Sequence, residues 1–152
     1  IDLFRKYVLK KKKFPLYLVL IGGVAGLLPD IDIFIYWLVS SFSTITLSQL
    51  HHTYTHNLII PIILVLFGVL TRKWEKISHL SFVISIGWAV HVVLDSIFSS
   101  SPIFYPFSSK EFGLHLIPPD FLSGSFFIGL DAIILLAWLV YEWKYKNIKD
   151  YI

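Results

Sequence analysis

Apolar positions along this chain fall into four long runs, each bounded by polar or charged residues. The runs cover residues 14–28, 58–70, 77–94 and 125–143. Crossing the hydrocarbon core of a bilayer takes roughly 17 to 25 helical residues. The last two runs satisfy this length, whereas the first two are short and need flanking residues, a thinned bilayer or neighbouring helices. The pattern predicts an all-α integral membrane protein with about four transmembrane helices.

A fifth apolar run, "IFIYWLV" at 33–39, is too short to cross a bilayer. It is typical of an interfacial or re-entrant segment. The following "SSFSTITLS" is a polar loop rather than a linker between domains, and the chain contains no internal repeat. We therefore expect a single integral-membrane domain over residues 1–152.

Composition agrees with a lipid environment. The chain is 56% hydrophobic and 15% charged, with a mean hydropathy of +0.73. So much apolar surface cannot all be buried in a small globule, and the 17% aromatic content suits membrane interfaces. Cysteine is absent, which excludes disulfides and thiolate ligands. Because methionine is absent too, we do not expect residue 1 to be a natural start.

Lysine and arginine are distributed unevenly between the loops. With four crossings, twelve of them fall on one side and Lys110 alone falls on the other. The twelve are Arg5, Lys6, Lys10, Lys11, Lys12, Lys13, Arg72, Lys73, Lys76, Lys144, Lys146 and Lys149. Because positive loops stay in the cytoplasm, we expect a multi-pass cell-membrane protein with both termini cytoplasmic. The lysine run before the first helix suits an anchor to anionic lipid, and no nucleic-acid partner is predicted.

The other ionisable residues gather on the outer side of this predicted topology. They are Asp30, Asp32, His51, His52, His56, His91, Asp95, Glu111, His115, Asp120 and Asp131. Charged groups in or near a bilayer are costly and usually have partners. Carboxylates and imidazoles from four separate segments therefore predict a metal site on the outer face.

Spacing supports this site in two of the segments. His91 and Asp95 are four residues apart, so both side chains lie on one face of a helix. Pro29 breaks the preceding helix, which leaves Asp30 and Asp32 flanking a tight loop. Each pair also has an explanation without a metal, as a local hydrogen-bonded pair or as caps of the next helix. Taken together on one face, they favour a metal site.

The segment "HHTYTHN" at 51–57 is more ambiguous. His52 and His56 have helical spacing, whereas His51 converges with His56 only if part of the segment is not helical. These histidines can also be surface groups that respond to pH, and His79 is interpreted as an interfacial histidine. Imidazole and carboxylate donors suit zinc, manganese or iron better than calcium or magnesium. We expect zinc, or alternatively manganese, with one to three ions.

The order of the motifs "GLLPDID", "HHTYTHN", "HVVLD" and "PFS" resembles the membrane-bound metal-dependent hydrolase family. That family includes inner-membrane hydrolases regulated by LexA and archaeal relatives, and the resemblance covers residues 22–108. It implies a metal centre built from Asp30, Asp32, His51, His56, His91 and Asp95. Two departures are His52, where the family has arginine, and Asn57, where it has serine. An arginine would clamp a phosphate group, and a protonated His52 would replace it only in part.

The leading functional hypothesis is a metal-dependent hydrolase in the membrane. We expect a phosphoesterase that acts on lipid or lipid-linked phosphate at the outer interface, with membrane lipid as both solvent and substrate. Asp131 would act as base or orient a histidine, His52 would bind an anion, and His115 and Lys110 would contact substrate. The alternatives are a divalent-cation transporter or binding protein and a structural membrane protein. The oligomeric state is not indicated by the sequence.

Overall fold

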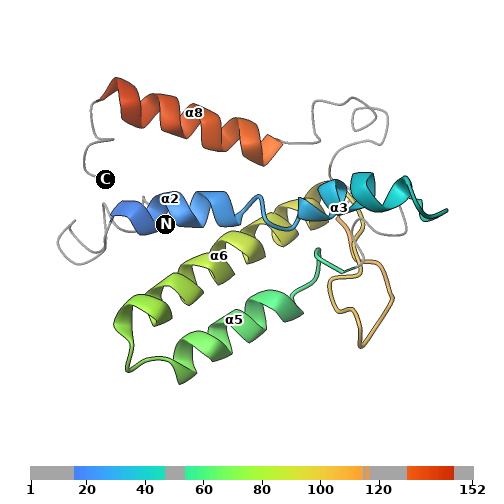
Figure 1. The fold of residues 1–152 in the computed structure, drawn as a ribbon, viewed down its shortest axis with the longest axis horizontal. Coiled ribbons are helices and arrows are strands. Elements are labelled where there is room, and N and C mark those ends of the chain that lie inside the picture. Colours follow the sequence, from blue (N-terminus) through green and yellow to red (C-terminus); the bar gives the residue numbers. More distant parts are fainter. Residues whose placement is uncertain (1–15, 47–53, 115, 117–129, 146–152) are drawn as a thin grey trace.

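The described part of the chain is helical. The computed structural model describes residues 16–46, 54–114, 116 and 130–145 (Figure 1). Its helices are α2 (Leu16–Ala25), α3 (Ile31–Ser40), α5 (Ile59–Leu70), α6 (Glu75–Phe98) and α8 (Leu130–Lys144). The one β-bridge within these residues pairs Ser101 with Phe112. The predicted all-α class is confirmed to this extent.

Only α6, among the described helices, is clearly long and apolar enough to cross a membrane. Its candidate span, Glu75–Ile97, has 23 residues and contains an 18-residue stretch with a mean hydropathy of 1.8. At about 1.5 Å per residue, such a helix exceeds the roughly 30 Å of a hydrocarbon core. By contrast, α2, α5 and α8 have 10, 12 and 15 residues. The prediction of four crossings is therefore not confirmed.

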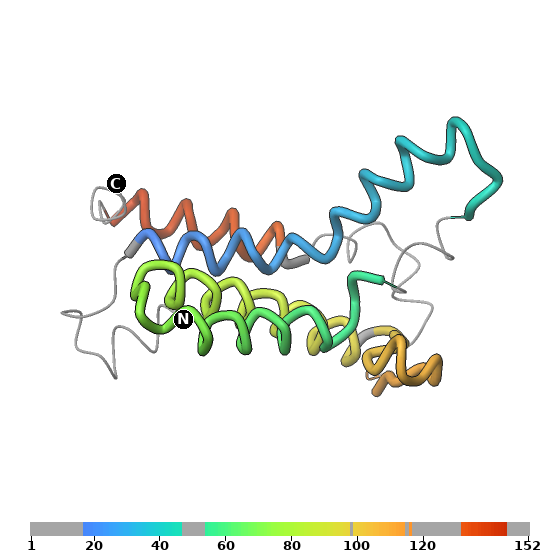
Figure 2. Tube along the Cα trace, turned by 60° about the horizontal axis from the view of Figure 1, so that its bottom comes forward, coloured from blue at the N-terminus to red at the C-terminus, as the bar shows by residue number. Residues whose placement is uncertain are grey.

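Helix α2 ends at Ala25, four residues before the break predicted at Pro29. The amide of Gly26 reaches the carbonyls of Gly22 and Gly23, and the chain then turns through Pro29 into α3. Helix α3 projects away from the other helices (Figure 2) and exposes Phe34 and Trp37. This agrees with the short apolar segment expected at 33–39.

Helices α2 and α6 pack closely because small residues face each other. A Cβ placed on Gly87 of α6 would collide with the carbonyl oxygen of Gly22 and lie 2.9 Å from Cβ of Ala25. It would also lie 3.1 Å from the backbone nitrogen of Gly26. Small residues four apart, as at Gly22 and Gly26, are typical of such close approaches between membrane helices.

Three serines of α6 join it to α5. Their hydroxyls donate to backbone carbonyls of α5: Ser78 to Gly68 at 2.8 Å, Ser81 to Leu64, and Ser85 to Pro61 at 2.8 Å. Since the serines recur every three or four residues, the bonds follow one face of α6. Helix α6 thereby positions both neighbours, α2 by close packing and α5 by hydrogen bonds.

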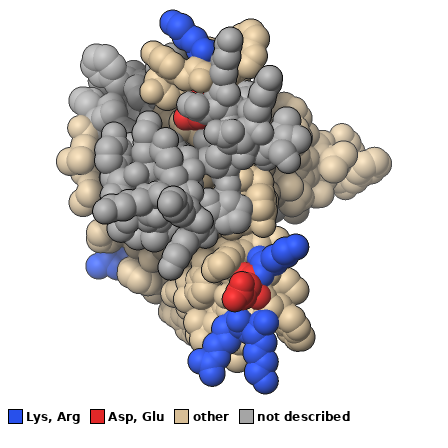
Figure 3. All heavy atoms as spheres, turned by 90° about the vertical axis from the view of Figure 1, so that its left-hand side faces the viewer, with Lys and Arg blue, Asp and Glu red and all other residues tan. Residues whose placement is uncertain are grey.

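Charged and apolar side chains are separated on the surface. The turn between α5 and α6 carries exposed Arg72 and Lys73, and a group of basic side chains is visible at that end of the molecule (Figure 3). Helix α5 exposes Ile62, Leu66 and Leu70 along its length. These exposed apolar side chains are suited to contact with lipid.

Candidate metal centre

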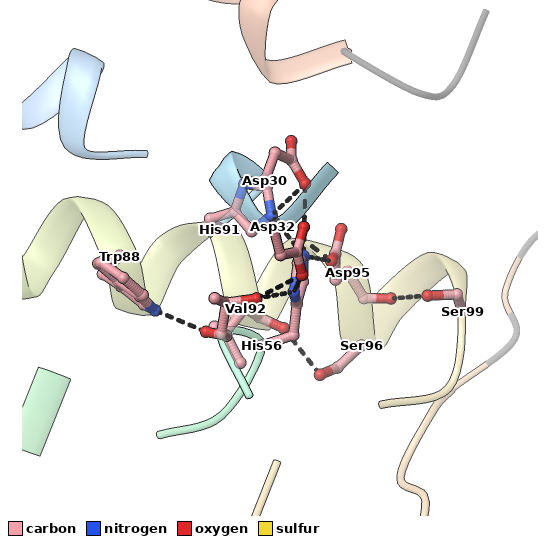
Figure 4. A network of polar contacts seen from close by, with 10 residues as sticks. Asp30, Asp32, His56, Trp88, His91, Val92, Asp95, Ser96 and Ser99 are labelled. Atoms are coloured by element: carbon pink, nitrogen blue, oxygen red, sulfur yellow. Dashed lines mark hydrogen bonds and ion pairs between the residues drawn. The ribbon is translucent and has the colours of Figure 1, made fainter. Parts of the chain in front are cut away.

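Four predicted ligands come together at the end of α6 that lies away from the basic turn. Asp30 stands at the junction of α2 and α3, and His56 lies just before α5. His91 and Asp95 occupy successive turns near the end of α6. Figure 4 shows these side chains pointing toward one another from three separate segments.

The donor atoms are closely spaced. One atom each from Asp30, His56 and His91 lie within 4.8 Å of one another, an arrangement that can hold a metal ion. Nε2 of His56 is 3.2 Å from Nε2 of His91, and Oδ1 of Asp30 is 3.4 Å from the first and 3.5 Å from the second. Oδ2 of Asp95 lies 3.1 Å from Nε2 of His56 and 3.5 Å from Nε2 of His91.

Burial differs between the imidazoles and the carboxylates. The side chains of His56 and His91 are 0% and 5% exposed, whereas those of Asp30 and Asp95 are 29% and 27% exposed. A reactant can therefore approach the cluster from the carboxylate side. Asp30 makes no hydrogen bond as a cap of α3, which removes the simplest explanation for it without a metal.

The cluster shifts the pKa values of Asp30, which precedes α3, and of His56, which precedes α5. Burial favours the neutral carboxyl of Asp30, but hydrogen bonds from His56 and His91 outweigh it and lower the pKa of Asp30 to about 2. Burial likewise disfavours the imidazolium of His56, but hydrogen bonds with Asp30 and Asp95 and the nearby Asp32 carboxylate raise its pKa to about 10. Without a metal, the cluster is therefore an ion-paired network.

Asp32 lies on the other edge of the His56 ring. Its Oδ2 is 3.6 Å from Nδ1 of His56 and accepts a hydrogen bond of 2.6 Å from the Thr55 hydroxyl. The same hydroxyl is 2.9 Å from Nδ1 of His56. The backbone carbonyl of Thr55 accepts a 2.8 Å bond from Nε1 of Trp88 on α6. Asp32, which the sequence predicts as a metal ligand, thus lies beside His56 but faces Nδ1 rather than Nε2.

Thr55 and Trp88 are absent from the sequence-based site. Threonine and tryptophan have no distinctive spacing here, and their contacts join residues far apart in the chain. The one available signal was the position of Thr55 directly before His56.

Asn57 holds the segment that carries His56. Its Oδ1 accepts a 3.0 Å bond from the amide of Ile59, and its Nδ2 donates at 2.7 Å to the carbonyl of Tyr54. The next residue, Leu58, donates to the carbonyl of Ile103 at 2.9 Å. This side chain, noted above as a departure from serine, thus serves to shape the backbone at the start of α5.

None of the other predicted site residues has been shown to reach the cluster within the part of the chain that the structure describes. His51, His52 and His115 lie outside the described residues. Asp131 is the second residue of α8, and its side chain is also outside the description. Lys110 is exposed in the segment after α6. The roles assigned to these residues stay predictions.

A family model described as "YdjM inner membrane protein" matches residues 4–148, nearly the whole chain. The chain belongs to the YdjM inner membrane protein family. No curated protein and no solved structure matches it. The family assignment agrees with the apolar span of α6 and with a location in the inner membrane, whereas the number of crossings and their orientation stay predictions.

This assignment corrects the resemblance drawn from the motifs. The expected family was a membrane-bound metal-dependent hydrolase family, but the family found is described as an inner membrane protein without mention of hydrolysis or metal. Three of the short motifs contain residues that meet in space, and such a meeting does not identify a reaction. For this YdjM-family chain, chemistry has to be argued from the cluster itself.

Proposed function

We propose that this protein is a membrane-embedded metal-dependent hydrolase, with a phosphoesterase activity toward lipid or lipid-linked phosphate. The observation that carries the proposal is the convergence of Asp30, His56 and His91 within 4.8 Å, from three separate segments. The proposal does not rest on the family description.

Hydrogen bonding alone accounts poorly for this geometry. Nε2 of His56 faces three polar atoms, on His91, Asp30 and Asp95, at 3.1–3.4 Å. A ring nitrogen carries at most one hydrogen and so donates along one direction. Nε2 of His91 faces the same carboxylates and Nε2 of His56 at 3.2–3.5 Å. A cation bound between these atoms would satisfy all of them at once.

The distances also fit a small divalent ion. Donors about 2.1 Å from a tetrahedral zinc ion lie roughly 3.4 Å apart. The triangle formed by His56, His91 and Asp30 has sides of 3.2, 3.4 and 3.5 Å. Two imidazoles with carboxylate oxygen are donors that zinc and manganese accept. The Asp95 carboxylate also faces Nε2 of His56 and Nε2 of His91, where it would share the ion or accept a proton.

A metal bound here would supply Lewis-acid chemistry, activating water and polarising a phosphoryl oxygen. Asp30, His56 and His91 would hold the ion. The partly exposed Asp95 carboxylate, 3.1 Å from Nε2 of His56, is placed to accept a proton from an attacking water. Hydrolysis of a phosphodiester would form one P–O bond to that water and break the P–O bond to the leaving alcohol, so the products would be an alcohol and a phosphate monoester.

The surroundings of the cluster favour an amphiphilic substrate. Helix α3, which begins beside Asp30, exposes Phe34 and Trp37, and such aromatic side chains favour the bilayer interface. A headgroup phosphate would then lie at the depth of the cluster while its acyl chains stay in lipid. This supports a lipid ester over a soluble one.

Metal content of the detergent-purified full chain tests the proposal. We expect at least one zinc or manganese per chain by mass spectrometry, lost in His91→Ala and in Asp30→Ala, because both side chains belong to the proposed ligand set. His79→Ala is the matched control, because His79 is exposed in the first turns of the same helix, and it should keep the metal. Loaded protein should then release a headgroup product from phospholipid vesicles.

Two results would reject the proposal. One is folded protein that binds no zinc or manganese after reconstitution. The other is metal-loaded protein that hydrolyses no phosphoester but carries zinc or manganese into proteoliposomes, which would establish transport instead.

A further inference from the structure

We propose that Asp32 and Thr55 act as a positioning pair that fixes the hydrogen of His56 on Nδ1, so that Nε2 presents its lone pair to the metal. This inference rests on the proposed metal centre, and it assigns Asp32 a different task from that of a ligand. The pair occupies the edge of the imidazole that faces away from Asp95 and His91.

Counting hydrogens leads to this assignment. The Thr55 hydroxyl has one hydrogen, and an ionised Asp32 carboxylate can only accept. The 2.6 Å contact between Thr55 Oγ1 and Asp32 Oδ2 therefore uses that hydrogen. At 2.9 Å from Nδ1 of His56, the same oxygen must then accept, so Nδ1 carries a hydrogen. A neutral imidazole has one ring hydrogen, so the lone pair that can coordinate a metal is then the one on Nε2.

The distances show that Thr55 mediates between the other two residues. Oδ2 of Asp32 is 3.6 Å from Nδ1 of His56, which is too long for a direct hydrogen bond. The hydroxyl between them closes the gap with two short contacts. Asp32 thus acts on His56 through Thr55.

The pair is held rigidly in the fold. Asp32 is 2% exposed in the first turn of α3. The backbone of Thr55 is fixed by the 2.8 Å bond from Trp88 on α6. Helix α6 also carries His91 and Asp95 (Figure 4). The same helix therefore positions these two residues of the cluster and, through Trp88, the backbone of Thr55. Groups that orient a ligating histidine typically contribute 10- to 100-fold in metal affinity.

The test is zinc affinity of the detergent-purified full chain, measured by competition with a chelating dye. Thr55→Val keeps the shape of the side chain but loses the hydroxyl, and we expect zinc to bind about 10- to 100-fold more weakly. Thr55→Ser restores the hydroxyl and should restore affinity. Thr71→Val is the matched control, because it removes a 2.7 Å hydroxyl bond to Phe67 at the other end of α5; its affinity should equal that of the wild type.

A double-mutant cycle separates positioning from ligation. Asp32→Asn should weaken zinc binding in the wild-type background, because its amide can donate to Thr55 and so favour a hydrogen on Nε2. It should have little further effect in the Thr55→Val background. An effect of Asp32→Asn that persists undiminished there would overturn the inference, since it would mean that Asp32 binds the ion directly.

A spectroscopic readout is independent of affinity. Nitrogen NMR of the zinc-loaded wild type should show His56 bound through Nε2 with a hydrogen on Nδ1. Zinc bound through Nδ1, or wild-type affinity in Thr55→Val, would overturn the positioning role while leaving the metal centre intact. Failure of the wild type itself to bind either zinc or manganese would instead reject the proposed function, so the two failures are distinguishable.

Discussion

Gly87→Ala tests whether helix packing sets the geometry of the metal centre. The added methyl would meet the carbonyl of Gly22, with Ala25 Cβ at 2.9 Å and the nitrogen of Gly26 at 3.1 Å. These are mostly backbone atoms, which cannot rotate away. Ordinary contacts of carbon atoms are about 3.5 to 4 Å, so α2 and α6 must separate by roughly 0.5 to 1 Å.

That separation would act directly on the site. Gly26 and Gly87 lie four residues before Asp30 and His91, whose donor atoms are 3.5 Å apart. Overpacking of this kind costs about 1–3 kcal/mol. If the substitution destabilises the zinc-bound protein by this amount and leaves the zinc-free protein unaffected, zinc affinity decreases roughly 5- to 150-fold.

Gly68→Ala is the matched control for this substitution. Its methyl would meet ring carbons of Phe82 at 3.2–3.3 Å, and a side-chain ring can shift where a backbone cannot. We expect zinc affinity, measured by dye competition, to fall in Gly87→Ala and to stay unchanged in Gly68→Ala. Equal losses in both variants, or no loss in either, would refute the link between α2–α6 packing and the site.

Three further outcomes are expected. Ser81→Ala removes the bond to the Leu64 carbonyl and should lower the free energy of unfolding by about 0.6 kcal/mol, measured by thermal unfolding in detergent; a gain in stability would contradict this. Asn57→Ala should cost about 1 kcal/mol and weaken zinc binding, whereas serine at this position should recover part of both because its hydroxyl can replace the Oδ1 acceptor. In chelator-treated protein, the raised pKa of His56 adds stability that is complete below pH 6.5 and lost as the pH rises through about 10. The contribution of Asp30 is complete above pH 3.8 and lost as the pH falls through about 2, so melting temperatures that rise from pH 6.5 to 10 would contradict the network.

The main features of the site could be inferred from where charged residues fall between apolar runs. Asp30, His56, His91 and Asp95 belong to three segments with no local connection, yet a membrane topology places them at one end. The prediction that His91 and Asp95 lie on one face of a helix follows from their separation by four residues, and both residues do lie in α6. The task of Asp32 could not be inferred, because it depends on which edge of the imidazole each carboxylate faces.

Contacts between helices were the least predictable part. The hydroxyl of Thr55 and the indole of Trp88 are ordinary groups until the fold brings them together. Gly22, Gly26 and Gly87 allow the backbone of α6 to approach that of the α2 segment closely. A contact between two segments cannot be inferred from the apolar pattern of either one alone. The number of crossings stays a prediction for a related reason, since the apolar runs extend beyond the helices that the described residues form.

The separation of the cluster along the chain has a consequence for biogenesis. The atoms that would hold the ion belong to residues 30, 56 and 91, and α6 supplies the last of them. During synthesis, Asp30 and His56 reach the bilayer before His91 has been translated. A chain that is still incomplete at this stage therefore does not carry the full set of ligands. Loading with metal would therefore follow the insertion and docking of α6, and occupancy of the centre would report that the three segments have been assembled correctly.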